Sequence, residues 1–261
     1  FLSVETTPGG GARHQLAYHY SQGRSPGVLF CNGFQSSMQG NKAVALETYC
    51  RQRGVAFCRF DYRGHGDFSS SSSWEECSNY TLSDWVHDAS TVLLETVMKD
   101  HDQVVVIGSS MGGWIACHLA IQYPQKIIGI IGLAAAPDFL EDIFLKLPQS
   151  QQDQWKRDGF LSLPTEYNPV PYRISWQLLE DARQKWNLLT KQPSDTRIPI
   201  QCRVHLVHGK LDNDIPWTKS LELMERLETD DVTLSIIKDG DHRLSRPQDL
   251  QRICGLLGEM L

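Results

Sequence analysis

The feature that most constrains the fold is a segment in which a strand-type run turns at once into a helix-type run. The apolar run at 104–107 precedes the pentapeptide Gly-Ser-Ser-Met-Gly at 108–112, and mostly apolar residues follow it. A serine between two glycines on such a turn has an exposed hydroxyl, because glycine removes side chains that would collide with the strand and helix. The segment makes Ser110 the candidate nucleophile; the alternative is a small-residue turn ending a buried strand.

Short β-type runs alternate with helix-type segments along almost the whole chain. This alternation predicts an α/β fold with a mostly parallel sheet flanked by helices. Thr81 or Ser83 is expected to cap the second helix. We expect strands at 15–20, 28–31, 56–60, 104–107, 128–133, 204–207 and 233–237, and helices at 42–53, 82–98, 112–123, 217–227 and 247–260.

Residues 137–199 interrupt the alternation. They are rich in glutamine, proline and aromatic residues and contain amphipathic helical pieces. We expect a core made of 1–136 and 200–261, with 137–199 inserted as a small helical cap over the strand ends. The serine-rich loop at 67–73 is expected to lie at the surface.

Composition excludes several classes of protein. Hydrophobic residues make up 41% of the 261 residues and charged residues 21%, as is usual for globular proteins. The formal net charge of -6 and the lack of a block of basic residues argue against a nucleic-acid partner. The longest apolar stretch, 127–136, has the length of a buried strand, so no membrane span is predicted.

Cysteine usage indicates a reducing compartment. The seven cysteines are scattered and odd in number, and their spacing fits neither a disulfide framework nor a metal site. The hydrolytic chemistry that we assign to the residues described next calls for no metal and no organic cofactor. The chain begins at Phe1 rather than methionine, which suggests a processed or truncated form.

Two loops, each directly after a predicted strand, carry candidate partners for Ser110. The loop at 208–216 reads His-Gly-Lys-Leu-Asp-Asn-Asp-Ile-Pro, and the loop at 239–243 reads Asp-Gly-Asp-His-Arg. A serine hydroxyl is a poor nucleophile unless a base removes its proton, and the base needs an orienting acid. We assign His242 as the base and Asp212 as the acid.

Other residues near these positions have competing interpretations. Asp214 could replace Asp212, but we expect it to cap the next helix. Asp138 follows the strand at 128–133 and is a further candidate for the acid. We interpret His208 as a buried strand-end residue that shapes the acid loop, and His65 as a surface or rim residue.

Acyl transfer also requires hydrogen-bond donors for the oxyanion that develops. The backbone N–H of Met111, at the predicted helix start, is one candidate. The backbone N–H of Phe34 is the other, because the loop Asn-Gly-Phe-Gln at 32–35 follows the strand at 28–31. The alternative for this loop is a plain tight turn.

Together these motifs resemble the α/β-hydrolase family. They occur in the family's order, with Ser110 before Asp212 and Asp212 before His242. Shared stretches lie at 32–34, 61–66, 108–112, 208–216 and 239–243. Within the family, the stretches at 25–27, 109–114, 215–217 and 241–243 are similar to those of mitochondrial enzymes that remove palmitoyl groups from proteins and cleave acyl glucuronides.

The resemblance implies an α/β-hydrolase fold and a monomeric serine hydrolase in mitochondria. It also implies that the substrate is an acylated protein cysteine or a small-molecule acyl ester. Alternatives on the same fold are a carboxylesterase or lipase, a hydrolase of carbon–carbon bonds, a serine aminopeptidase and a non-catalytic ligand-binding protein. An aminopeptidase needs acidic cap residues, for which the sequence offers Glu141, Asp142, Glu166 and Glu180.

Overall fold

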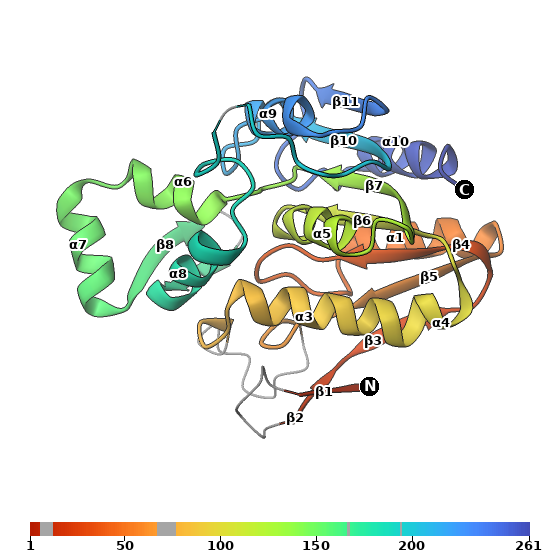
Figure 1. The fold of residues 1–261 in the computed structure, drawn as a ribbon, viewed down its shortest axis with the longest axis horizontal. Coiled ribbons are helices and arrows are strands. Elements are labelled where there is room, and N and C mark those ends of the chain that lie inside the picture. The colour runs from red at the N-terminus through yellow and green to blue at the C-terminus, as the bar shows by residue number, and fades with distance from the viewer. Residues whose placement is uncertain (6–12, 67–76, 166–167, 194) are drawn as a thin grey trace.

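A twisted central sheet with helices on both faces dominates the computed structural model (Figure 1), which describes residues 1–5, 13–66, 77–165, 168–193 and 195–261. Within these residues the sheet has seven strands in the order β11-β10-β7-β6-β4-β5-β3. All neighbours are parallel except β3, which is antiparallel to β5. The strands are β3 (Tyr18–Ser21), β4 (Arg24–Cys31), β5 (Val55–Phe60), β6 (Val104–Ser109), β7 (Ile127–Leu133), β10 (Arg203–Gly209) and β11 (Val232–Ile237).

The central strands are apolar on both sides, as a parallel sheet covered on two faces requires. In β6, Val104 and Val106 belong to one buried cluster, whereas Val105 and Ile107 belong to the cluster on the opposite face. This alternation follows from the two-residue period of a strand. The α/β architecture predicted from the sequence is therefore confirmed.

Helices cover both faces of the sheet, and their buried side chains belong to these two clusters. One cluster includes side chains of α1 and α10, and the other includes side chains of α3, α5 and α9. The bounds are α1 (Asn41–Gln52), α3 (Leu82–Val92), α4 (Met98–Asp100), α5 (Met111–Gln122), α9 (Thr218–Arg226) and α10 (Pro247–Gly258). A π-helical turn, η1 (Leu93–Val97), joins α3 to α4.

One expectation about these elements is corrected, and two others are confirmed. The predicted strand at 15–20 is two strands, because Leu16 of β2 (Arg13–Leu16) pairs with β1 (Leu2–Glu5) while Tyr18 of β3 pairs with β5. The predicted helix at 82–98 is confirmed, since the chain is helical from Leu82 to Asp100, with a π-helical turn at 93–97 between its two α-helical parts. Thr81 caps α3 by accepting a hydrogen bond from the Asp84 amide, as expected for one of the two candidates.

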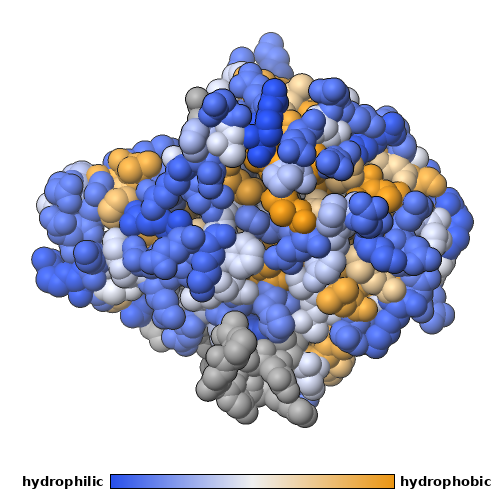
Figure 2. Space-filling model, in the orientation of Figure 1, coloured by the Kyte–Doolittle hydropathy of each residue, from blue (hydrophilic) through white to orange (hydrophobic). Residues whose placement is uncertain are grey.

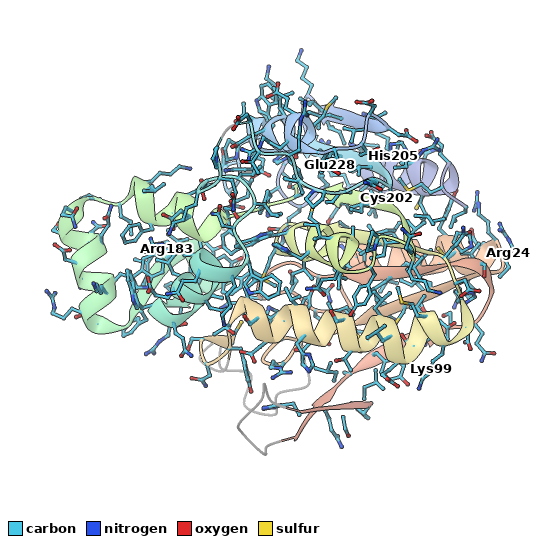
Figure 3. The ribbon with its side chains drawn as sticks, viewed as in Figure 1. Arg24, Lys99, Arg183, Cys202, His205 and Glu228 are labelled. Carbon is cyan, nitrogen blue, oxygen red and sulfur yellow. The ribbon has the colours of Figure 1, made fainter. Side chains whose placement is uncertain are left out.

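Residues 137–199 contain more than helices. They form α6 (Phe139–Lys146), α7 (Gln149–Asp158), β8 (Phe160–Thr165), β9 (Asn168–Ser175) and α8 (Trp176–Lys185), and β8 and β9 pair as an antiparallel hairpin that the sequence does not predict. The rings of Phe144, Trp155 and Trp176 pack against one another there, edge to face in the two pairs that include Trp176 and tilted in the third. Figure 3 labels Arg183 in this part of the chain, where its guanidinium lies 4.4 Å from the centroid of the Phe144 ring.

The surface agrees with the composition. In Figure 2 most of the visible face is hydrophilic, and its apolar residues form small separate patches. Within the described residues, every helix is too short or too polar to span a bilayer. All seven cysteines are free, and five of them are buried. The predicted surface loop at 67–73 lies outside the described residues.

Candidate active site

Ser110 is the single residue that connects β6 to α5. Its backbone has φ 54° and ψ −118°, a conformation that costs a non-glycine residue energy and persists only where its surroundings enforce it. The Ser110 amide donates to the Leu133 carbonyl at 2.9 Å, and the Ser110 carbonyl accepts from the amides of Gly113 and Ala136 at 2.9 and 3.1 Å. These three hydrogen bonds hold the turn that presents the hydroxyl.

The glycines on either side of Ser110 are required by close backbone contacts. A Cβ atom on Gly112 would collide with the carbonyl oxygens of Cys31 and Asn32, at the end of β4. A Cβ atom on Gly108 would collide with the backbone of Gly112. The pattern at 108–112 therefore reflects the tight packing of α5 against two strands.

The structure brings Ser110, His242 and Asp212 together at the carboxyl edge of the sheet. The Ser110 Oγ lies 3.1 Å from His242 Nε2, and His242 Nδ1 lies 2.7 Å from Asp212 Oδ2. The His242 side chain is 15% exposed and the Asp212 side chain 0%. The imidazole can therefore reach both the hydroxyl and a substrate, while the carboxylate contacts only protein.

Asp212 sits in a dense network of donors. His208 Nε2 lies 3.0 Å from its Oδ2, and the amides of Asp214 and Ile215 donate to its Oδ1 at 2.9 and 2.8 Å. Burial acts to raise the pKa of Asp212, but the hydrogen bonds from His208 and His242 outweigh it and hold that pKa well below its usual range. Asp212 is therefore ionised at neutral pH.

His208 and the two competing aspartates are now placed. His208 is buried and shapes the acid loop, as predicted. Asp138 accepts hydrogen bonds from the backbone amides of residues 188–190, so the partners of its carboxylate are these amides and not the imidazole of His242. The expectation that Asp214 caps a helix is wrong: α9 has no side-chain cap, and Asp214 lines a cavity beside Ser110 instead.

One group of side chains has the spacing of metal ligands within the described part of the chain. Ligand atoms of Asp212, Asp214 and His242 lie within 4.8 Å of one another. A metal ion there would have to displace the Asp212–His242 hydrogen bond that orients the imidazole. The donor set therefore fits a hydrolytic role for the histidine better than metal binding.

The two predicted oxyanion donors belong to elements that meet at Ser110. Met111 is the first residue of α5, where backbone N–H groups lack intrahelical acceptors and the helix dipole favours negative charge. Gly33, which precedes Phe34, lies so close that a Cβ atom on it would be 3.4 Å from Ser110 Cβ. Both peptide segments thus flank the candidate nucleophile.

The ring of Phe34 anchors its loop in an aromatic cluster. It lies 5.8 Å from Trp85, 6.1 Å from Phe139 and 5.7 Å from Tyr172, measured between ring centroids. His65 packs behind it at 6.2 Å and is 4% exposed, so the expectation of a surface or rim residue is wrong. Burial lowers the pKa of His65 to about 4.

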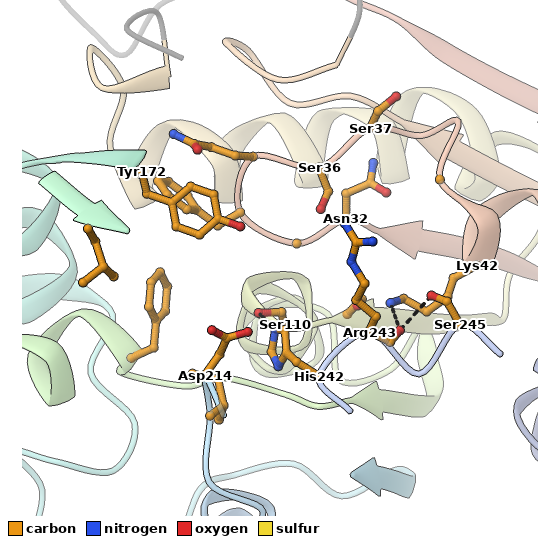
Figure 4. Close-up of a pocket in the computed structure, with 18 of the residues that line it drawn as sticks. Asn32, Ser36, Ser37, Lys42, Ser110, Tyr172, Asp214, His242, Arg243 and Ser245 are labelled. Carbon is orange, nitrogen blue, oxygen red and sulfur yellow. Dashed lines mark hydrogen bonds between the residues drawn. The ribbon is translucent and has the colours of Figure 1, made fainter. Parts of the chain in front are cut away.

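A cavity of about 530 Å³ opens beside Ser110 and His242 (Figure 4). Residues 139–174 supply an apolar wall, and the loops after β4 and β11 supply a polar one. Lys42, Tyr172 and Arg243 line the cavity although the sequence gives them no role. The apolar wall consists of Phe139, Ile143, Leu163, Tyr172 and Ile174.

Comparisons with known proteins find similar sequences and structures over most of the chain. A sequence model of the alpha/beta hydrolase family matches residues 28–252. A mitochondrial palmitoyl-protein thioesterase of Mus musculus is 35% identical over 247 residues, which are 94% of this chain and 78% of the relative. The solved mouse alpha/beta hydrolase domain-containing protein 10 has 32% identity and a TM-score of 0.82, with 94% of this chain and 93% of that chain covered. A putative hydrolase from Agrobacterium vitis S4 has 30% identity and a TM-score of 0.86, with 99% and 97% covered.

Proposed function

The chain belongs to the alpha/beta hydrolase family, and on this premise we propose that it is a serine hydrolase with the catalytic triad Ser110, His242 and Asp212. The observation that carries the proposal is the hydrogen-bonded chain from Ser110 Oγ through His242 to Asp212 Oδ2, at the wall of a cavity. Such a chain makes a serine hydroxyl nucleophilic at neutral pH.

The proposed reaction proceeds through an acyl-enzyme. Ser110 Oγ attacks the acyl carbonyl carbon while His242 accepts the hydroxyl proton. The bond to the leaving sulfur or oxygen then breaks, and His242 gives that atom the proton. A water molecule deprotonated by His242 attacks the acyl-serine, which releases the carboxylic acid and restores the hydroxyl.

Two features of the site stabilise the charges that develop during this reaction. Asp212 fixes the imidazole tautomer and stabilises the imidazolium that forms. The backbone N–H groups of Phe34 and Met111 bind the oxyanion, and the N-terminus of α5 adds a favourable potential.

The substrates that we propose are acyl thioesters and esters, with S-acylated protein cysteines and small-molecule acyl esters as the two sources. The mouse relative is named for palmitoyl-protein thioesterase activity and for mitochondria, and we extend both to this chain. The apolar wall at 139–174 supports an apolar acyl group. In this proposal residues 137–199 act as the cap and the enzyme is a monomer.

An aminopeptidase is less well supported by the acidic residues near the cavity. Asp142 pairs with Lys219 at 2.8 Å, and Glu141 and Glu180 both pair with Arg183, at 2.6 and 3.3 Å. These carboxylates are engaged by protein cations rather than arranged around a substrate amine. Glu166 lies outside the described residues.

Replacement of the nucleophile tests the catalytic assignment. The Ser110→Ala variant is expected to lose fluorophosphonate labelling and p-nitrophenyl ester turnover, because no other group in the proposed reaction forms the acyl-enzyme. Mass spectrometry of the labelled wild type should place the adduct on Ser110. Undiminished turnover in the variant refutes the triad, and a wild type that is never labelled points to a non-catalytic ligand-binding protein.

A chain-length series tests the acyl specificity. We expect kcat/KM for acyl thioesters to rise from acetyl toward long chains, because each additional buried methylene contributes about 0.8 kcal/mol. Ser110→Ala serves as the blank for every substrate. A preference for acetyl would remove the palmitoyl assignment and leave the hydrolase intact.

A further inference from the structure

The charged side chains that line the cavity are unevenly placed. Among the described lining residues, Asp142 is neutralised by Lys219, at 2.8 Å. In Figure 4, Asp214 lies on one side of Ser110, whereas Lys42 and Arg243 lie on the other. Lys146 is a further lining cation, on the wall that residues 139–174 form, and the carboxylates of Asp241 and Asp249 act on Lys42. Lys42 and Arg243 are the two cations that line the cavity on the side away from the apolar wall.

Arg243 directly follows His242 in the chain, and both residues line the cavity. The residue is exposed and lines the cavity, and Figure 4 shows its side chain directed toward Asn32 and Ser36. In the proposed reaction His242 delivers its proton to the leaving group. A leaving group in the cavity would therefore occupy the same space that His242 and Arg243 line.

Lys42 is placed where a cation costs stability. It is the second residue of α1, whose first turn has no acidic side chain, and the helix dipole there disfavours positive charge. Burial and the nearby Arg243 lower the pKa of Lys42 to about 8. Its ammonium donates to the Arg243 carbonyl oxygen, which uses one of three N–H donors. Violations of local stability rules of this kind are expected at functional sites.

We propose that Lys42 and Arg243 form an anion subsite for the leaving group, so that the enzyme prefers acyl thioesters and esters whose leaving group carries a carboxylate or phosphate near the scissile bond. This inference rests on the proposed function and adds a substrate class to it. Arginine and lysine are the side chains best suited to bind either oxyanion.

Matched substrate pairs that differ by one charge test the subsite. One pair is S-acyl-4′-phosphopantetheine and S-acyl-pantetheine, and the other is an S-acyl-Cys-Glu peptide and its Cys-Gln counterpart, all with the same acyl chain. For wild type we expect kcat/KM to be about tenfold higher for the anionic member of at least one pair, the size of effect typical of one hydrogen bond to a charged group. The pair with the larger ratio identifies phosphate or carboxylate as the source.

Variants assign the preference to the two cations. Arg243→Gln and Lys42→Gln are each expected to lower the anionic-to-neutral ratio severalfold, and 0.5 M salt should lower it in wild type. Arg24→Gln is the matched control: this exposed residue begins β4, at the end of the molecule away from the cavity (Figure 3), and its ratio should equal that of wild type.

The outcomes separate this inference from the proposed function. A wild-type ratio near one for both pairs, or a ratio that Arg243→Gln does not change, overturns the subsite even though Ser110→Ala still abolishes turnover. If Lys42→Gln lowers turnover of both members of a pair equally, Lys42 only positions the His242 loop and the two-cation subsite is refuted. Persistent turnover in Ser110→Ala rejects the proposed function itself.

Discussion

Asp212 and Asp214 are separated by one residue, yet their surroundings differ in every respect that bears on catalysis. The Asp212 side chain is fully buried and accepts hydrogen bonds from His208, His242 and two backbone amides. Asp214 is exposed at the cavity wall. An aspartate in the first environment is ionised and fixed in place, whereas one in the second is solvated.

This contrast predicts very different effects of the same substitution. Asp212→Asn should lower kcat by about 10³- to 10⁴-fold, because an amide cannot hold the imidazole in the tautomer that accepts the serine proton. Asp214→Asn, the matched control, should cost less than about tenfold. The measurement is p-nitrophenyl ester turnover with both variants checked for folding by circular dichroism; equal losses in the two would contradict the assignment of the acid.

At the scale of elements, the connection from β6 to α5 depends on backbone approaches that only glycine permits. Gly112 faces the carbonyl oxygens at the end of β4, so the helix packs directly onto a strand. Gly255, in the last turn of α10, has open space around the position of a Cβ atom. The two glycines thus have opposite structural roles.

Alanine at these two positions should change stability in opposite directions. Gly112→Ala is expected to destabilise the fold by about 1–3 kcal/mol through overpacking and to lower turnover by shifting Ser110. Gly255→Ala should stabilise it by about 0.5–1 kcal/mol through helix propensity. Urea unfolding monitored by fluorescence checks both, and a Gly112→Ala variant with wild-type stability and turnover would contradict the packing argument.

Some elements of the fold could be predicted from the sequence, and others could not. Buried parallel strands are continuous apolar runs, and their carboxyl ends share one edge, so the meeting of residues 110, 212 and 242 was predictable. The hairpin β8–β9 was not, because Pro164 and Pro171 argue against strands. A two-stranded hairpin has two outer edges, where proline is tolerated. Lys42 lines the cavity because of how α1 packs in the fold, and no local sequence pattern around position 42 indicates this.

For the molecule as a whole, buried imidazoles connect stability to pH. Burial lowers the pKa of His65 and of His118 to about 4, and His118 Nε2 lies 2.8 Å from the Trp186 carbonyl oxygen. In the unfolded chain both titrate near 6.5. Between these values the unfolded state binds protons that the folded state does not, so this contribution to stability is complete above about 6.5 and is lost as the pH falls toward 4.

We therefore expect the free energy of unfolding to fall between pH 6.5 and pH 4.5, by up to about 3 kcal/mol for each imidazole. Urea midpoints measured in half-unit steps provide the test. In the double variant His65→Gln/His118→Gln the slope over this range should be smaller than in wild type. An unchanged slope would mean that neither imidazole is kept neutral by the fold.

The two walls of the cavity originate in different stretches of the chain. The groups that we propose to be catalytic come from loops at the ends of β4, β6, β10 and β11, whereas the apolar wall comes from residues 139–174. Exchange of the latter stretch with that of a related protein should therefore alter which acyl chains are accepted while the chemistry is conserved. Such a modular arrangement makes the segment a natural target for grafting new selectivity onto an unaltered catalytic apparatus.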